Sequence, residues 1–276
     1  MTFISPRSRQ PNRWVLRLLL CVGVLRLTAA AWAEPLTQQM IGDVVFGDAL
    51  TTSAADTNGD GETTAADVAI PGLLFNGKVS GFFALNLNDA LTYRVTDPMG
   101  GVTMETVKVY SANSAGGFEL NDIQVDSSQM LKNERQEYSN ANGRLTYDGD
   151  TDFLQQVRST CTPKLLRLVL PIIAGQMFST TSTCQVRTLQ NLFVGVIQRT
   201  DSFMPIEILE SLTVPAGTFR HIVHISGSTD AGGFAQTEEA YFAPGIGAVL
   251  RLTTAGGDTI RSELVGGTIN GHPIGQ

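Results

Sequence analysis

The sequence predicts a mainly β protein with a curved antiparallel sheet, half-barrel-like or sandwich in form, and a small N-terminal loop–helix module. From about Lys78 onward, short runs rich in Val, Thr, Tyr, Phe, Leu and Ile alternate with turn residues, and helical periodicity is scarce. Diglycine pairs lie between most of these runs, and glycine tolerates the positive φ of tight turns. Residues 34–77 are instead rich in Ala, Thr, Asp and Gly, which indicates a separate module.

The first 33 residues have the pattern of a secretory signal peptide. A basic start without acidic residues leads into an apolar run from Trp14 to Ala31, and Ala31-Trp32-Ala33 matches the small-x-small pattern that signal peptidase cleaves. Arg17 and Arg26 interrupt the run, whereas an uninterrupted spanning helix needs roughly 20 apolar residues. We therefore exclude residues 1–33 from the fold and expect a secreted or periplasmic protein that is not an integral membrane protein after cleavage.

Loss of this signal peptide makes the protein more acidic. The segment carries five arginines and no acidic residue, so its removal changes the formal net charge from −7 to −12. An acidic surface without a Lys/Arg cluster repels phosphate backbones and anionic membranes, and it suits a soluble protein that binds cations. We therefore expect no nucleic-acid partner.

Two cysteines, Cys161 and Cys184, remain after signal cleavage. An exported chain in an oxidising compartment tends to pair such a couple. We predict one disulfide between them rather than two buried free thiols. It would close a loop of about 22 intervening residues and contribute on the order of 3 kcal/mol to stability.

The N-terminal module contains a candidate cation-binding loop that runs from Asp56 to Asp67. Oxygen-bearing side chains stand at alternate positions of this loop, and Gly61 stands where the chain must turn sharply. Calcium needs this alternation, because a chain that coils around the ion presents every second side chain inward. A polar surface turn uses similar residues, but the joint match of ligand positions and glycine favours calcium. The predicted ligands are Asp56, Asn58, Asp60, Glu62 through its carbonyl, Thr64 through a water, and Asp67.

The loop resembles the dockerin form of the EF-hand, in which the twelfth residue is Asp and a helix follows. This resemblance implies calcium as a cofactor and a cohesin-like protein as a partner. Dockerins carry two such loops, whereas this sequence has one, and Pro71-Gly72 would disturb the following helix within about two turns. A second acidic stretch, Asp148 to Asp152, lacks the required glycine and is interpreted as a solvated turn.

The larger domain, residues 78–266, is expected to form an antiparallel meander. The stretch from Lys164 to Gln176 could form a helix or a buried strand, and Pro171 and Gly175 favour extended structure. Residues 267–276 are interpreted as a flexible tail. The best predicted strands are Leu91–Val95, Val102–Tyr110, Phe118–Val125, Arg144–Tyr147, Thr218–Ser226, Phe234–Phe242, Ala248–Thr253 and Thr259–Leu264.

Four segments of the β domain carry a resemblance to a known family: residues 83–93, 170–178, 214–219 and 241–247. They resemble the repeated motifs of uncharacterised bacterial exported β domains. In those domains an opening segment with proline-leucine, glycine and an aromatic residue precedes a curved antiparallel sheet. That family has no settled activity. The resemblance therefore implies an architecture and an exported location rather than a chemistry.

The β domain offers few candidate catalytic groups. It has no Gly-x-Ser-x-Gly elbow, phosphate-binding glycine loop or zinc-like Cys/His spacing. His221 and His224 lie three apart in a predicted strand and therefore point to opposite faces, which prevents a shared metal. The adjacent Glu238 and Glu239 point apart for the same reason, one being solvated and the other buried or paired. We predict no catalytic residue and no enzymatic activity.

Taken together, these features favour a secreted, calcium-binding, non-enzymatic protein with a β-rich binding or surface-attachment domain. Two alternatives stay open. The curved sheet could carry an apolar ligand in a half-barrel cavity, because small-molecule sites are typically concave and mostly apolar. The dockerin resemblance implies instead an accessory protein in polysaccharide breakdown, with a cohesin-like protein or a glycan as partner.

Overall fold

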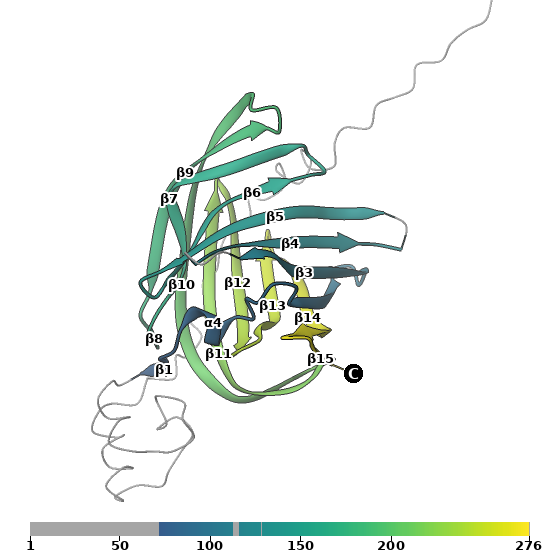
Figure 1. The fold of residues 1–276 in the computed structure, drawn as a ribbon, viewed down its shortest axis with the longest axis vertical. Helices are drawn as coiled ribbons and strands as arrows, with labels where there is room; N and C mark the ends of the chain where they lie inside the picture. Colours follow the sequence, from purple (N-terminus) through teal and green to yellow (C-terminus); the bar gives the residue numbers. More distant parts are fainter. Residues whose placement is uncertain (1–71, 113–115, 128, 276) are drawn as a thin grey trace, which may run out of the picture.

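The computed structural model describes residues 72–112, 116–127 and 129–275, which form a closed antiparallel sheet with one short helix (Figure 1). The predicted signal peptide and the predicted calcium loop, Asp56 to Asp67, lie outside these residues. The elements are β1 (Leu73–Phe75), α4 (Val79–Phe82), β2 (Ala90–Thr96), β3 (Val102–Ala112), β4 (Gly117–Val125), β5 (Met130–Ala141), β6 (Arg144–Asp152), β7 (Val157–Val169), β8 (Ile172–Ile173), β9 (Phe178–Thr188), β10 (Phe193–Val214), β11 (Gly217–Ala231), β12 (Phe234–Ala243), β13 (Gly247–Ala255), β14 (Asp258–Ile269) and β15 (His272–Ile274).

Thirteen strands join in the order β13-β12-β11-β10-β9-β7-β6-β5-β4-β3-β2-β14-β15. Because β13 also pairs with β14, the sheet closes into a barrel of twelve strands, and β15 lies beside β14 as an extra strand. Every pairing in this sheet is antiparallel. The predicted curved antiparallel sheet is confirmed, and it closes on itself rather than remaining a half-barrel or forming a sandwich.

The predicted strands are all present, and the stretch from Lys164 is extended, since β7 continues to Val169 and β8 follows. The strands β5, β7, β9 and β10 were not predicted as whole strands from the sequence. In β5 the reason is visible, because Lys132 and Gln136 contact interior acids where apolar side chains are expected. A polar inner face removes the apolar–polar alternation that reveals a half-buried strand.

The C-terminal residues 267–274, expected to be a flexible tail, belong to β14 and β15. Asn270 and Gly271 have φ of 52° and 77° and form a two-residue hairpin turn in which Ile269 pairs with His272. Asp89 fixes this turn by accepting a 2.7 Å hydrogen bond from the Asn270 backbone nitrogen. The Asn-Gly pair is the sequence signal that points to this hairpin.

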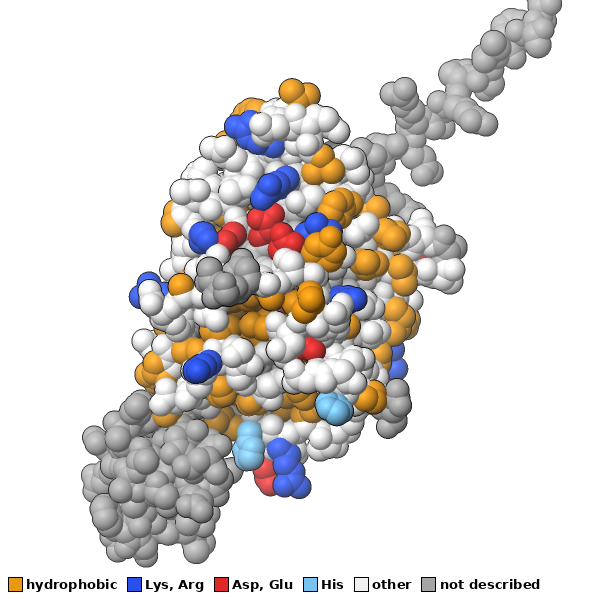
Figure 2. Space-filling model, in the orientation of Figure 1, with side chains coloured by type: hydrophobic (Ala, Val, Ile, Leu, Met, Phe, Trp, Pro, Cys, Tyr) orange, Lys and Arg blue, Asp and Glu red, His pale blue; other side chains and the backbone are white. Residues whose placement is uncertain are grey.

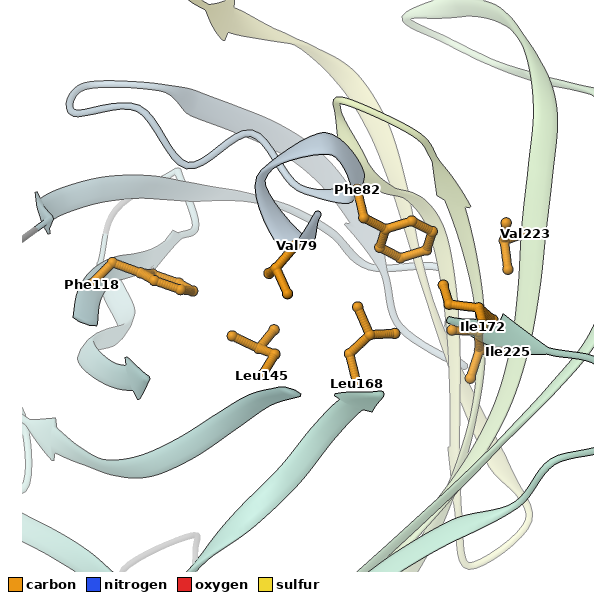
Figure 3. Packing of buried hydrophobic residues seen from close by; sticks show 8 residues of the cluster. All are labelled: Val79, Phe82, Phe118, Leu145, Leu168, Ile172, Val223 and Ile225. Atoms are coloured by element: carbon orange, nitrogen blue, oxygen red, sulfur yellow. The ribbon is translucent and has the colours of Figure 1, made fainter. Parts of the chain in front are cut away.

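The helix α4 packs among residues of the inner face of the sheet. Val79 and Phe82 are buried, and their side chains lie in the same cluster as Leu145 of β6 and Leu168 of β7 (Figure 3). A bridge between Phe83 and the β12–β13 turn fixes the segment that follows the helix. Within the part of the chain that the structure describes, no helix has the length and hydropathy that crossing a membrane requires.

The predicted disulfide is present. Cys161 on β7 and Cys184 on β9 are directly opposite each other in register, and their sulfur atoms are 2.03 Å apart. Both cysteines are buried with Tyr147 and Leu165. The bridge therefore joins two neighbouring strands at a small apolar cluster.

Candidate ligand-binding site

A cavity of about 400 Å³ lies inside the barrel, lined by side chains from strands around the ring. This volume falls in the range of about 300–1,000 Å³ that is typical of small-molecule sites. In the space-filling view, hydrophobic side chains are visible in the middle of the face, with acidic and basic side chains beside them (Figure 2). The cavity wall likewise divides into an apolar part and a charged part.

The apolar part of the wall adjoins α4. Aromatic packing shapes it, because the ring of Phe242 lies 5.3 Å from that of Phe82 and 5.6 Å from that of Phe83. On the neighbouring strands β2 and β3, Leu91 and Val107 occupy paired positions and both line the cavity. Representative lining residues from six segments are Phe83, Leu91, Val107, Leu120, Leu168 and Phe242.

A first group of paired ions contains two charged residues of the cavity wall, Asp122 and Arg251, together with their partners Glu105 and Lys132. Arg251 Nη2 on β13 donates a 2.6 Å hydrogen bond to Glu105 Oε2 on β3. Lys132 Nζ lies 3.3 Å from Glu105 Oε1 and also donates to Asp122, which accepts a further hydrogen bond from Gln136. Glu105 and Asp122 are 5% and 3% exposed. Buried carboxylates of this kind persist because cations and amide donors compensate for lost solvation.

The same contacts decide how these groups ionise. Burial raises the pKa of Asp122 to about 6, although the nearby Lys132 opposes the rise. Burial also disfavours ionised Glu105, but Arg251 and Lys132 hold its pKa below the usual range. The Asp122 carboxyl is therefore the member of this group that takes up a proton first as the pH falls.

A second group of ions consists of two arginines that share one carboxylate. Asp201 is fully buried, and its oxygens lie 3.1 Å from Arg167 Nη1 and 3.0 Å from Arg199 Nε. The guanidinium carbons of Arg167 and Arg199 lie 5.2 and 5.4 Å from the centre of the Tyr147 ring, within cation–π range. Both arginines line the cavity.

The two arginines exceed the negative charge in direct contact with them. Burial lowers the pKa of Arg199, but Asp201 and, to a smaller extent, Asp150 outweigh burial and raise it. The Asp150 carboxylate itself accepts a hydrogen bond from Ser159. The Nε atoms of Arg167 and Arg251 are buried and have no hydrogen-bond partner among the described residues. Buried donors without acceptors are uncommon in folded proteins. The wall thus offers hydrogen-bond donors and positive charge beside an apolar surface.

The adjacent glutamates of β12 point to opposite sides of the sheet, as the sequence predicts. Glu238 lines the cavity, whereas Glu239 accepts hydrogen bonds from His224, at 2.6 Å, and from Ser226, at 2.9 Å. Burial raises the pKa of Glu239, but these two hydrogen bonds outweigh it and lower the pKa. Glu239 is therefore the hydrogen-bonded glutamate of the pair, in agreement with the prediction that one of the two is buried or paired.

The acidic stretch from Asp148 to Asp152 is not the solvated turn that the sequence suggests, because it lies within β6. Asp148 accepts hydrogen bonds from Ser139 and Lys164 on the flanking strands. No group of three or more His, Cys, Asp or Glu side chains in the described ranges is arranged to hold a metal ion. The predicted ligands, Asp56 to Asp67, are outside those ranges.

Apart from Glu238, the charged residues of the cavity wall were not predicted from the sequence. A signal was present at two positions: Arg167 stands between Leu166 and Leu168, and Arg251 between Leu250 and Leu252. An arginine inside an apolar strand is rarely buried without a partner. The pattern can indicate a buried cation, but it cannot indicate which acid on which strand compensates for it.

No protein-family model matches the chain, and no curated protein matches it. Two solved structures resemble it in fold. One, a protein described as exported with a YmcC-like fold from Bacteroides fragilis NCTC 9343, has a TM-score of 0.48 and 13% identity and covers 66% of this chain and 96% of its own. The other, described as a lipoprotein from Parabacteroides distasonis ATCC 8503, has a TM-score of 0.49 and 13% identity, with coverages of 67% and 97%. Neither likeness assigns a function.

Proposed function

We propose that this chain is an exported, non-enzymatic binding protein that holds an amphiphile with an acidic head group inside its barrel. The observation that carries the proposal is the position of Arg167 and Arg199 beside the apolar wall of the cavity. An apolar chain gains free energy on leaving water for such a wall. A carboxylate or similar head group would accept hydrogen bonds from guanidinium donors, which form strong, planar pairs with acids.

The alternative apolar ligand, with no head group, explains less of the site. A purely apolar ligand would leave Arg167 and Arg199 with one directly contacting carboxylate, Asp201, for two positive charges. A buried charge without a compensating partner is costly. The acid group of an amphiphile can pair with the second arginine while its apolar chain covers the apolar wall.

A fluorescence titration tests this function. The amphiphilic dye 1-anilinonaphthalene-8-sulfonate reports binding to an apolar site, and dodecanoate should displace it from the processed protein. Ala240 lines the cavity on β12, so Ala240→Phe should fill the space and abolish saturable dye binding. Ala235→Phe is the matched control, because Ala235 is an exposed residue of the same strand. Equal dye binding by both variants would exclude the cavity as the site.

The head-group assignment needs its own comparison. Arg167→Gln leaves Arg199 to neutralise Asp201, and it should weaken dodecanoate binding about tenfold or more while changing binding of the neutral methyl ester little. Arg220→Gln, at an exposed arginine, should change neither. If Arg167→Gln melts early, Arg167→Lys keeps the charge and provides a folded substitute. Equal losses for acid and ester would contradict an acidic head group.

A second candidate function, binding of calcium, rests on the alternating oxygen ligands of Asp56 to Asp67. Calcium would act as a structural ion that stiffens the start of the mature chain, and a cohesin-like or glycan partner follows only from the dockerin resemblance. Titration calorimetry of the processed protein should register heat with Ca²⁺, and Asp56→Ala with Asp60→Ala should abolish it. Asp148→Asn, in β6, serves as the control. Absence of heat in the wild type would remove this function.

A further inference from the structure

The β9–β10 hairpin projects beyond the rest of the sheet (Figure 1). Apolar side chains at its end are exposed. Leu192 is 66% exposed and Phe193 is 60% exposed, and Val194, Val196 and Ile197 follow on the same strand as further exposed residues. Hydrophobic and basic side chains lie close together at the corresponding end of the space-filling view (Figure 2). Exposed apolar patches of this kind mark sites that contact a partner or a membrane.

The exposed side chains lie on both faces of the hairpin. Successive residues of a regular strand point to opposite faces, so Val196 and Ile197, which pair in regular register with β9, point apart. A protein partner that packs on one face of a strand would leave the other face in water. A lipid bilayer can surround both faces at once.

A neighbouring turn extends the apolar end. The backbone nitrogen of Leu189 donates a 3.0 Å hydrogen bond to the carbonyl of Gln156, which holds the β6–β7 turn beside the hairpin. Leu154 in that turn is exposed, as is Leu189 itself. The docking tip is defined as Leu154, Leu189, Leu192, Phe193, Val194, Val196 and Ile197.

The charges around this tip suit an anionic surface. Between Gln185 and Gln198 the chain has one arginine, Arg187, and no acidic residue, although the net charge of the whole chain is −7. Arg187 donates to the carbonyl of Asn191, lies 6.0 Å from the Phe193 ring and has no carboxylate partner among the described residues.

Two charged side chains of the adjoining β6–β7 segment already have partners within the protein. Arg158 pairs with Glu137, and Asp152 accepts hydrogen bonds from the backbone nitrogens of Leu154 and Gln155. Arg187 is therefore the arginine of this region that can contact a lipid head group. Asp152 is held in the β6–β7 turn by its two backbone hydrogen bonds.

We infer that the docking tip inserts into the surface of a bilayer that contains anionic lipids. Apolar side chains that enter the head-group region and a cation that contacts anionic lipids together favour such binding. A second copy of the chain fits less well, because standard protein interfaces use about 20–30 residues from each partner and the tip has far fewer. The inference does not depend on the proposed cavity function.

A single tryptophan can report insertion directly. Both tryptophans of the chain, Trp14 and Trp32, lie in the predicted signal peptide, so the processed protein has none. Phe193→Trp therefore places one tryptophan in the docking tip. Vesicles of phosphatidylcholine with phosphatidylglycerol should shift its emission to the blue, and brominated lipids should quench it. Met99→Trp, at a residue 94% exposed on the β2–β3 turn, should show neither change.

Sedimentation with the same vesicles tests the contribution of each part. Leu192→Asp with Phe193→Asp should abolish cosedimentation, whereas Met99→Asp should leave it unchanged. Arg187→Gln should weaken binding to anionic vesicles about fivefold and leave the weaker binding to pure phosphatidylcholine unaltered. Because all of these positions are at the surface, their melting curves should match that of the wild type.

Three results would overturn the inference. The wild type could stay in the supernatant with anionic vesicles, or the double aspartate variant could sediment as the wild type does. Light scattering could instead reveal a concentration-dependent dimer that the aspartate variant abolishes, without vesicle binding. That last result would assign the tip to a second copy of the chain.

Discussion

Arg251 on β13 hydrogen-bonds Glu105 on β3 at 2.6 Å, although β14 and β2 separate these strands in the ring. The contact therefore spans the interior rather than joining neighbours in the sheet. Tyr93 on β2 lies beside it, with its ring centre 5.0 Å from the Arg251 guanidinium. A buried ion pair in this position links two parts of the wall that are three strands apart in the ring of twelve and contributes to the charged part of the cavity.

Removal of one partner of this pair should be costly. Glu105→Gln leaves the Arg251 charge buried without its closest acid, and we expect the free energy of unfolding to fall by about 3–5 kcal/mol. Arg251→Met combined with Glu105→Gln should cost less than the sum of the single changes. Urea denaturation of the double-mutant cycle measures the coupling. As a control, Glu137→Gln, which breaks the exposed pair with Arg158, should cost less than about 1 kcal/mol.

Stability should depend on pH through Asp122. Because burial raises its pKa to about 6, the folded state binds more protons than the unfolded state between about pH 4 and pH 6. The stability of the wild type relative to Asp122→Asn should therefore fall by about 2–3 kcal/mol as the pH rises through this window and then level off. Urea melts at a series of pH values test this, with Asp126→Asn as an exposed control. Parallel curves for the wild type and Asp122→Asn would refute it.

Loss of the disulfide should lower stability without changing the fold. Cys161→Ala with Cys184→Ala should cost about 3 kcal/mol, since the bridge restricts the unfolded chain while hydrogen bonds already pair the two strands. Denaturation with and without a reductant measures the effect in the wild type, and the double variant should not respond to the reductant. A reductant effect of equal size in the double variant would place its origin elsewhere.

The packing of α4 can be tested at Phe82, which is fully buried. Phe82→Ala should lower the free energy of unfolding by about 3–5 kcal/mol, because it leaves a cavity where the ring contacts Phe75 and Phe242. Phe82→Leu, which retains most of the volume, should cost much less. Thermal and urea melts compare the two. Equal costs would mean that the aromatic ring, rather than its volume, stabilises this end of the core.

The sequence alone determined several local features of this protein. Short runs rich in strand-favouring residues between turn signals predicted strands such as β12 and β13, because both signals depend only on neighbours along the chain. It also predicted the pairing of Cys161 with Cys184, since two cysteines allow one bridge. The opposite directions of Glu238 and Glu239 followed from the strand period of two.

Only the tertiary structure decided how these parts enclose a site. The ring closes where β14 pairs with both β13 and β2, and the pairing of Thr96 with Arg261 joins residues that no local pattern relates. The partners of Arg251 and Asp201 were hidden for the same reason, because a buried charge selects its counter-ion by proximity in space. Strand periodicity specifies on which face of the sheet a side chain lies. Closure of the sheet specifies which side chains of other strands it contacts inside the barrel.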